Sequence, residues 1–385
     1  MSTARGARDG DWLRLRPGAD LDGYVLERRV GFGGMAEVWL ARCGATPVAI
    51  KVLHTDLGAD PEFRDMFRDE IDLARSLDHP NVVRVLDARE VGGALIQIME
   101  WIDGSDLNSL EVRLEREGGR FPVAAAVAVT RAAACGLDAA HRLLDRDGRP
   151  RELVHRDVAP QNIMVARDGR VKVVDFGVAK ARNRLTRTAA GVVKGRLGYM
   201  APEQARGLDV TAKADVFALG VVAWELVAMD RMFPLGGGVL EVAERPPPPR
   251  LDALDAAVPA ALADLVSTML AAEPDARPSM ARVIDRLDAL GAPELELAAW
   301  CRSVFPSRRV KTAVAPRPRS RPSGPVTPTA VDGSAPEPSP FDDRTQPDAA
   351  SALDDEPEGD WAGAPTVYDR APGAAPESEA EADQA

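Results

Sequence analysis

The chain has 385 residues, enough for one large two-lobed domain or two ordinary domains with full hydrophobic cores. Its formal net charge of −12 argues against a nucleic-acid-binding protein that works through a basic surface. The three cysteines, Cys43, Cys135 and Cys301, are far apart and match no metal-ligand spacing. We therefore expect incidental thiols in a reducing compartment.

Neither a secretory signal nor a membrane span is expected. Residues 1–22 are polar and contain no apolar core of a signal peptide. A spanning helix needs about 20 apolar residues. The most apolar stretches, 121–134 and 216–229, are shorter, and Glu225 lies inside the second. These features predict a cytoplasmic protein without a membrane span.

The predicted elements begin as strands and continue as helices. Apolar runs around glycines indicate strands between residues 24 and 53, and residues 61–77 then carry apolar side chains at helical spacing. Further strands are expected at 82–87 and 94–99. From residue 122 the pattern is mainly helical, at 122–143, 216–229, 259–270 and 279–290, interrupted by a strand pair at 163–165 and 171–174. This order predicts an α+β protein in two lobes.

Composition divides the chain further. A polar leader (1–23) precedes the two-lobed domain (24–290), and a short helical extension (291–305) follows it. Fourteen of the 31 prolines fall within 306–385, among Ala, Ser, Asp and Glu and with little apolar periodicity. Such a segment cannot bury enough surface to offset its ordering entropy, so we expect a disordered tail.

A glycine-rich stretch between two predicted strands is the first candidate site. It runs from Gly31 to Val38 and begins with Gly31, Phe32, Gly33 and Gly34. Alone, it fits an ordinary hairpin turn as well as a loop whose backbone closes over nucleotide phosphates. Lys51 ends an apolar strand further on, and the next helix carries Glu70. Glu70 could pair with Lys51 and hold it toward the phosphates.

Three oxygen-bearing side chains occur around the short strand pair. Asp157 ends a His-Arg-Asp triplet, Asn162 follows five residues later, and Asp175 begins an Asp-Phe-Gly triplet after the second strand. Hard oxygen ligands suit Mg²⁺, which prefers a few carboxylates or amides together with substrate phosphates. Phosphoryl transfer needs mainly positioning and charge neutralisation. The pattern therefore favours a phosphoryl-transfer site.

These motifs and the triplet Ala201-Pro202-Glu203 occur in the order of the protein-kinase signature set. Over residues 24–290 the chain resembles the eukaryotic-like Ser/Thr protein kinases of bacteria. The resemblance implies the two-lobed protein-kinase fold with a small β-rich lobe and a larger helical lobe. It also implies ATP with Mg²⁺ or Mn²⁺, protein substrates and a role in signal transduction.

The resemblance implies catalytic and metal-binding roles. Lys51 would hold the phosphates and Glu70 would clamp it. Asp157 would orient the substrate hydroxyl, and Asn162 and Asp175 would bind the metal.

The resemblance also implies a nucleotide pocket. Its residues would be Gly31, Phe32, Gly33, Gly34, Val38, Ala49, Lys51, Met99, Glu100, Ile102, Asp106 and Met164. Met99 would be the gatekeeper, Glu100 and Ile102 would present backbone groups to the adenine, and Asp106 would contact the ribose. The adenine ring would lie between Val38, Ala49 and Met164.

Three further residues resemble the family's fold-stabilising set. Glu203 and Arg277 would form a structural ion pair, and Asp215 would be a buried helix anchor.

The chain departs from the family pattern at the loop that would face the transferred phosphate. The expected Lys two residues after Asp157 is Ala159, and the expected Thr before Leu-Gly-Tyr is Arg196. One interpretation is a pseudokinase or ATP-binding scaffold. The other, which we favour, is a relocated cation: Arg196 or Lys194 reaches the γ-phosphate, because Arg can bond two phosphate oxygens at once.

Loss of that Lys also resembles tyrosine kinases. However, Pro160 and Gln161 fill the positions where those enzymes carry an Arg, and no Trp follows Tyr199. We therefore expect Ser and Thr acceptors. A small-molecule phosphotransferase is disfavoured by the Ala-Pro-Glu triplet and the expected Glu203–Arg277 pair.

Two phosphorylation hypotheses concern regulation. Arg156 would be an unpaired cation unless an anion meets it, so we expect Thr186 or Thr188 to be autophosphorylated and to pair with it. In the alternative, Arg156 bonds backbone carbonyls permanently.

The tail contains a repeated threonine pattern. Thr329, Thr345 and Thr366 each have an Asp three residues later. Phosphorylated, they would resemble ligands of forkhead-associated domains, which read phosphate with basic residues. The alternative is a solubilising linker.

Overall fold

The computed structural model describes residues 15–33, 36–54, 64, 67–68, 71, 73–145, 147–176, 197–233, 242, 244, 246–291 and 294–305. These residues all belong to one compact unit. The predicted leader up to residue 14, the tail from 306 onward, and most of the segment between Asp175 and Glu203 lie outside the described residues.

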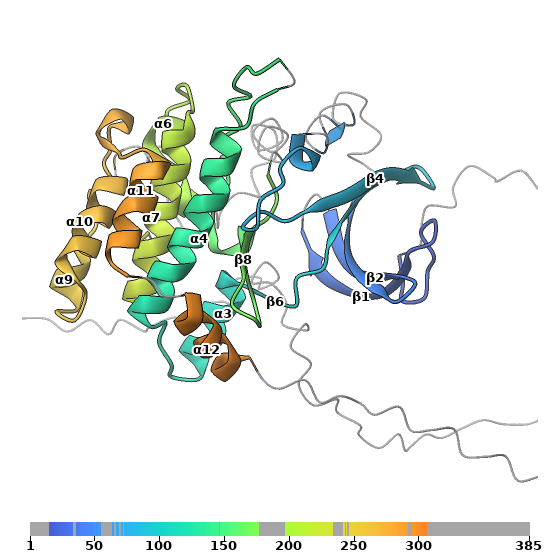
Figure 1. Ribbon diagram of the computed structural model, residues 1–385, viewed down its shortest axis with the longest axis horizontal. Coiled ribbons are helices and arrows are strands. Elements are labelled where there is room, and N and C mark those ends of the chain that lie inside the picture. The colour runs from blue at the N-terminus through green and yellow to red at the C-terminus, as the bar shows by residue number, and fades with distance from the viewer. Residues whose placement is uncertain are drawn as a thin grey trace, which may run out of the picture. The chain divides into compact units, whose positions relative to one another are not determined.

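The N-terminal part is a five-stranded antiparallel sheet in the order β1-β2-β3-β5-β4. Figure 1 shows it in blue and teal, with β1 and β2 next to each other. Its strands are β1 (Val25–Phe32), β2 (Ala36–Cys43), β3 (Thr46–Leu53), β4 (Val85–Val91) and β5 (Ala94–Glu100).

Strand β3 is buried on both faces from Val48 to Leu53. Successive side chains of a strand point to opposite faces. Val48, Ile50 and Val52 accordingly join one apolar cluster, whereas Ala49 and Leu53 join another. By the same alternation, Lys51 shares the face of Ala49 and Leu53, where it is only 6% exposed.

A second, three-stranded sheet carries the loop residues of interest. It consists of β6 (Gly104–Asp106), β7 (Ile163–Ala166) and β8 (Val171–Val173), with β7 in the middle. The Val83 amide donates to the Val173 carbonyl at 2.9 Å, and the Val173 amide donates to the Asn81 carbonyl at 2.8 Å. These bonds join β8 to the segment that leads into the first sheet.

The C-terminal part is helical, as the sequence pattern predicts (Figure 1). Its helices are α3 (Leu107–Arg116), α4 (Val123–His141), α6 (Pro202–Ala205), α7 (Ala212–Ala228), α9 (Leu251–Leu254), α10 (Ala260–Met269), α11 (Met280–Ala289) and α12 (Glu294–Val304), with single 3₁₀ turns η1 (Pro160–Asn162), η2 (Leu197–Tyr199) and η3 (Pro274–Ala276).

Helix α7 is the centre of this part. Every residue from Ala214 to Val227 is buried, and the helix contacts α4, α10 and α11. Helix α4 contacts β8 and approaches residue 81 closely, since a Cβ on Gly136 would lie 2.5 Å from the Asn81 carbonyl oxygen. Only glycine fits there, so α4 lies directly against the chain that enters the sheet.

Helix α4 is long and apolar enough, by length and composition alone, to cross a membrane. With 19 residues, it is longer than the apolar stretch 121–134, which we expect to be too short for a span. In the fold, 61% of its most apolar window is buried inside the protein. Its contacts with α7, α11, α12 and β8 make it a core helix of this part of the chain.

The predicted structural ion pair is present. The Arg277 guanidinium donates to both carboxylate oxygens of Glu203, at 2.7 and 2.8 Å, and further to the carbonyls of Ala271, Lys213 and Ala272. Both side chains are buried. Such a pair resists disruption mainly because either partner, left alone, would be an uncompensated buried charge.

Replacing Arg277 by Ala is expected to lower the free energy of unfolding by about 3–5 kcal/mol, because Glu203 is left buried without its cation. Urea denaturation followed by circular dichroism measures the change. The matched control is Arg250→Ala, because Arg250 pairs with Asp252 and Asp264 but is 47% exposed. The control should leave the midpoint unchanged, and equal losses in both variants would contradict the assignment.

Candidate active site

An ion pair connects the first sheet to the residue that follows β8. The Lys51 ammonium lies 2.7 Å from Oδ1 of Asp175, although the two residues are 124 positions apart in the sequence. Lys51 is almost completely buried, whereas the Asp175 side chain is 31% exposed. The cation is therefore fixed at the place where a carboxylate faces solvent.

A buried carboxylate shapes the loop that carries Asp157. Asp215, in the first turn of α7, accepts hydrogen bonds from the backbone amides of His155 and Arg156 and from Nε2 of His141, each at 2.8 Å. Its side chain is fully buried. As expected from the sequence, Asp215 is a helix anchor, and it fixes two successive peptide groups.

Two residues at the site have left-handed backbone conformations. Arg156 has φ 65° and Asp175 has φ 63°. This conformation costs a non-glycine residue free energy, so it persists only when the surroundings impose it. Asp215 supplies that constraint at Arg156. The strained backbone conformations thus occur at Arg156, next to Asp157, and at Asp175 itself.

His155 joins the two loops. Its Nε2 lies 2.9 Å from the Val174 carbonyl, which can only accept, so Nε2 carries the proton. The other ring nitrogen then accepts the Asp157 amide at 3.3 Å. The ring also packs edge-on against Phe176, with centroids 4.6 Å apart. One imidazole therefore positions the backbone on both sides of the site.

Asn162 orients Asp157. Its Nδ2 donates to the Asp157 carbonyl at 2.7 Å and to Oδ2 of the Asp157 carboxylate at 3.1 Å. The Val174 amide donates to the Asn162 carbonyl at 2.9 Å, which holds the loop against the residue before Asp175. Since both side-chain bonds use the amide nitrogen, the amide oxygen is the atom left to act as a ligand.

The donor set fits Mg²⁺. No group of three or more His, Cys, Asp or Glu suited to a metal occurs among the described residues. Mg²⁺ does not require such a cage, because it is held by one or two protein oxygens together with phosphates and water. Asn162 and Asp175 are the two predicted ligands. The Lys51 ammonium, 2.7 Å from Asp175, offsets the negative charge of that carboxylate.

The predicted adenine residues come together on one face of the first sheet. Ala49, Met99 and Ile102 are buried members of one apolar cluster, and Met164 packs against it. Ala49 also lies opposite Met99 in the β3–β5 pair. Val38 lies opposite Gly31 in the β1–β2 pair, where an added Cβ on glycine would meet the Val38 side chain at 3.5 Å. The arrangement is an apolar wall beneath a glycine-bearing strand.

The glycine-rich loop has a contact that the motif did not predict. Nε2 of His54, just after β3, lies 2.7 Å from the Gly33 carbonyl oxygen, and the His54 ring meets Phe32 edge-on. Phe32 itself is 54% exposed. His54 thus restrains the loop from the neighbouring strand, and only the antiparallel pairing of β2 and β3 brings it there.

Two predicted nucleotide residues also have structural bonds. Glu100 accepts from the Lys172 ammonium at 2.6 Å and from the Arg84 amide at 2.8 Å. Asp106 caps α3, accepting the amide and hydroxyl of Ser109 at 2.9 and 2.7 Å. Burial raises the pKa of the Asp106 carboxyl, and the bonds from Ser109 oppose the rise. The sequence pattern did not indicate Lys172, whose buried ammonium pairs with Glu100 at the end of β5.

Several predicted residues cannot be placed. Gly34, Glu70, Arg196, Lys194, Thr186 and Thr188 lie outside the described residues. Ala159 is described and is 1% exposed. Nε of Arg156 is buried and has no hydrogen-bond partner among the described residues, so a donor remains for an anion.

The chain matches the protein kinase domain family over residues 24–286. It is 42% identical to the Tyrosine-protein kinase MasK of Myxococcus xanthus over 215 residues, which cover 54% of this chain and 33% of that protein. It is 39% identical to the Serine/threonine-protein kinase PknA of Mycobacterium tuberculosis over 247 residues, covering 61% and 54%. It spans from a third to about half of the length of these relatives.

A solved structure gives the same picture of the fold. The kinase domain of Mycobacterium tuberculosis PknI matches with a TM-score of 0.55 and 30% identity, covering 71% of this chain and 99% of that domain.

Replacing Asp215 by Asn is expected to lower the free energy of unfolding by about 3 kcal/mol or more, because three charge-assisted hydrogen bonds are weakened. The His155 and Arg156 amides should also lose protection from hydrogen exchange, which is measured alongside urea denaturation. Asp209→Asn, an exposed position in the loop before α7, is the control and should leave both readouts unchanged. Unchanged exchange at residues 155 and 156 in Asp215→Asn would refute the anchor.

Proposed function

Because the chain belongs to the protein kinase domain family, we propose that it transfers the γ-phosphate of ATP to serine or threonine hydroxyls of proteins in bacterial signalling. The proposal rests on one arrangement of side chains. Lys51 pairs with Asp175, Asn162 pairs with Asp157, and His155 bonds the backbone beside both pairs. We also propose that the protein is cytoplasmic, because α4 serves as a core helix and not as a membrane span.

Each residue has a chemical task in this proposal. Lys51 moves its charge from Asp175 toward the phosphates of ATP when these are present. Asp157, held by Asn162, accepts the hydrogen bond of the attacking hydroxyl and then its proton. Asn162 and Asp175 would hold Mg²⁺ or Mn²⁺, which would neutralise the charge of the phosphates. The apolar wall of Ala49 and Met164 holds the adenine.

Serine or threonine is the preferred acceptor class, and tyrosine is the second candidate. The preference rests on the absence of a Trp after Tyr199 and on PknA, whose name gives it as a serine/threonine kinase. The tyrosine candidate is favoured by the name of MasK and by Ala159, where Ser/Thr kinases of this family carry Lys. For the missing cation we propose Arg196, with Lys194 as its alternative.

Phosphorylation of the protein itself is part of the proposal. Nε of Arg156 is buried and has no hydrogen-bond partner among the residues that the structure describes, which supports an incoming phosphate, because a guanidinium bonds phosphate oxygens strongly. Thr186 and Thr188 are the candidates. In the tail, we propose that phosphorylated Thr329, Thr345 and Thr366 recruit a forkhead-associated domain, which a pull-down with phosphorylated against unphosphorylated tail peptide tests.

The full chain incubated with radiolabelled ATP and Mg²⁺ should label itself and a protein acceptor. Asp175→Ala should reduce labelling by at least about a thousandfold, because metal and phosphate positioning are lost together. Arg196→Ala should reduce it by about tenfold or more, as expected for one lost charged phosphate contact. Asp209→Asn is the control. If the wild type is not labelled, the proposed kinase activity is wrong and an ATP-binding scaffold is favoured. If Arg196→Ala keeps full activity, only the hypothesis that Arg196 replaces the missing Lys is wrong.

Mass spectrometry of the labelled chain is expected to find phosphate on Thr186 or Thr188 and on tail threonines. Thr186→Val/Thr188→Val should then lower activity toward an added substrate, because Arg156 loses its anion. Phosphotyrosine as the main product would reverse the acceptor class, and an unmodified segment in fully active protein would remove the regulatory part.

A further inference from the structure

The glycine-rich loop has few side chains with which to fix its own backbone. Gly31 and Gly33 have no side chain, and glycine loses more conformational freedom on ordering than any other residue. A loop that closes over phosphates has to give up this freedom when it binds, and the cost lowers the affinity. Contacts that already fix the loop therefore favour phosphate binding.

Three side chains beside this loop, Arg29, Phe32 and His54, pack together, and we call them the loop clamp. The Arg29 guanidinium lies over the Phe32 ring, 5.1 Å from its centre, and the His54 ring meets Phe32 edge-on at 5.4 Å between centroids. The Arg29 guanidinium also lies 3.8 Å from the Glu37 carboxylate on β2. The clamp thus connects the end of β1 to β2 and to the end of β3, although Phe32 is 54% exposed.

His54 adds a hydrogen bond to the loop backbone. Its Nε2 lies 2.7 Å from the Gly33 carbonyl oxygen, which can only accept, so Nε2 carries the proton. The Gly33 amide donates to the Ala36 carbonyl at 3.0 Å. Both polar backbone groups of Gly33 are therefore held, one by the loop itself and the other by a side chain from outside it.

Strand β3 carries both this restraint and the predicted phosphate-binding cation. His54 follows the last residue of β3, three positions after Lys51. Lys51 is buried, and its backbone lies between Val38 of β2 and Gln97 of β5 in the sheet. A strand held on both sides has little freedom to shift. The position of the loop relative to the Lys51 ammonium is therefore set from one rigid element.

We propose that His54 is a positioning residue for the phosphates of ATP. By holding the Gly33 carbonyl, it keeps the glycine-rich loop at a fixed place relative to Lys51, so that less ordering remains for the phosphates to impose. The inference rests on the proposed function, because it concerns how the nucleotide of that function is held. Adenine packing on Ala49 and Met164 does not involve the clamp, so the contribution of His54 is specific to the phosphate end of the nucleotide.

The test measures nucleotide binding to the full chain by isothermal titration calorimetry, with Mg²⁺ and a non-hydrolysable ATP analogue, and separately with adenosine. His54→Phe keeps an aromatic ring against Phe32 and removes the donor. It should bind the ATP analogue about threefold to tenfold more weakly, as for one neutral hydrogen bond, and adenosine as tightly as the wild type does. An equal loss for both ligands would indicate general damage to the pocket and would overturn the positioning role.

Two amide variants form a matched pair. The side-chain nitrogen of His54→Gln lies at about the reach of Nε2, whereas that of His54→Asn is one carbon too short. We expect His54→Gln to restore the affinity for the ATP analogue and His54→Asn to resemble His54→Phe. If Gln fails to rescue, or if Asn rescues equally well, the bond to the Gly33 carbonyl is not the cause.

Hydrogen exchange gives a readout that needs no nucleotide. The Gly33 amide should exchange faster in His54→Phe and His54→Asn than in the wild type and His54→Gln, because its bond to Ala36 opens more often when the loop is released. Unchanged exchange at Gly33 in His54→Phe would contradict the restraint. In kinase assays, KM for ATP should rise while kcat stays unchanged, as for an interaction that is equally strong in the ground state and the transition state.

The outcomes separate this inference from the proposed function. A wild type that phosphorylates protein while all three His54 variants bind the ATP analogue as tightly as it does overturns the role of His54 alone. A wild type that transfers no phosphate, but whose variants show the expected order of affinities, overturns the kinase activity and leaves His54 as a positioning residue of a nucleotide-binding protein.

Discussion

The Asp215 carboxylate accepts two consecutive backbone amides and a histidine ring in the protein interior, and the site depends on this arrangement. Because a buried carboxylate needs all its donors, the amides of His155 and Arg156 cannot rotate away. Arg156, held by one of these bonds, has a left-handed backbone conformation directly before Asp157. His155, fixed by the same bonds, transmits the constraint to Val174 and so to Asp175. Geometry at Asp157 and at Asp175 therefore has a common origin in the first turn of α7.

The two ends of the site belong to different parts of the fold. Lys51 comes from a strand whose buried faces hold it in place, whereas Asp157, Asn162 and Asp175 come from turns around β7 and β8. The Lys51–Asp175 bond joins them directly. Lys51 is buried, whereas Asp175 is partly exposed, so a phosphate that replaces Asp175 beside Lys51 leaves neither charge buried and unpaired. The ion pair of Glu203 and Arg277 is the opposite case, buried on both sides and purely structural.

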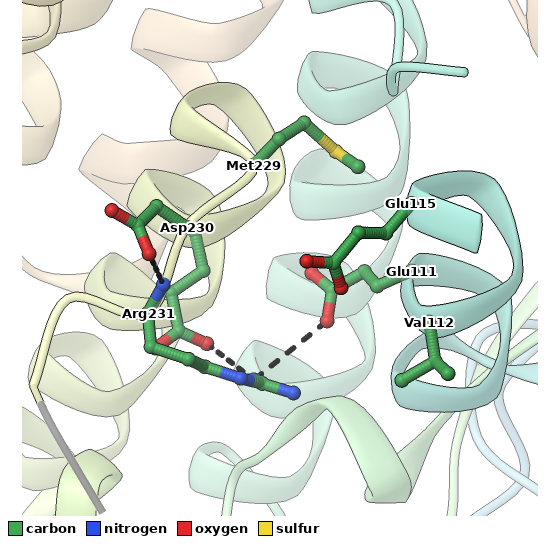
Figure 2. Close-up of a pocket in the computed structure, with 7 residues that line it drawn as sticks. Glu111, Val112, Glu115, Met229, Asp230 and Arg231 are labelled. Atoms are coloured by element: carbon green, nitrogen blue, oxygen red, sulfur yellow. Dashed lines mark hydrogen bonds and ion pairs between the residues drawn. The ribbon is translucent and has the colours of Figure 1, made fainter. Parts of the chain in front are cut away.

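Local spacing in the sequence indicates the candidate site residues, whose roles stay predictions. Asp157, Asn162 and Asp175 lie in short motifs around a predictable strand pair. Apolar stretches predicted helices at 122–143 and 216–229, and the structure has them at 123–141 and 212–228. Local spacing could not indicate residues that act through distant contacts. His54 reaches Gly33 across a strand pair, and Lys172 pairs with Glu100, 72 positions away in the sequence. The Glu111 carboxylate lies 3.7 Å from the Arg231 guanidinium only because α3 packs beside Arg231 (Figure 2). No local pattern distinguishes these from ordinary surface charges. Asp106 was expected at a ribose, and its capping bonds to Ser109 became visible only with the start of α3.

A crystal structure of the full chain with Mg²⁺ and a non-hydrolysable ATP analogue is the most direct test of the central claim. We expect the metal on Oδ1 of Asn162 and the Asp175 carboxylate. The Lys51 ammonium should lie within hydrogen-bond distance of the phosphates, and the adenine should lie between Ala49 and Met164. A nucleotide bound elsewhere, or bound at this wall with the metal away from Asn162 and Asp175, would contradict it.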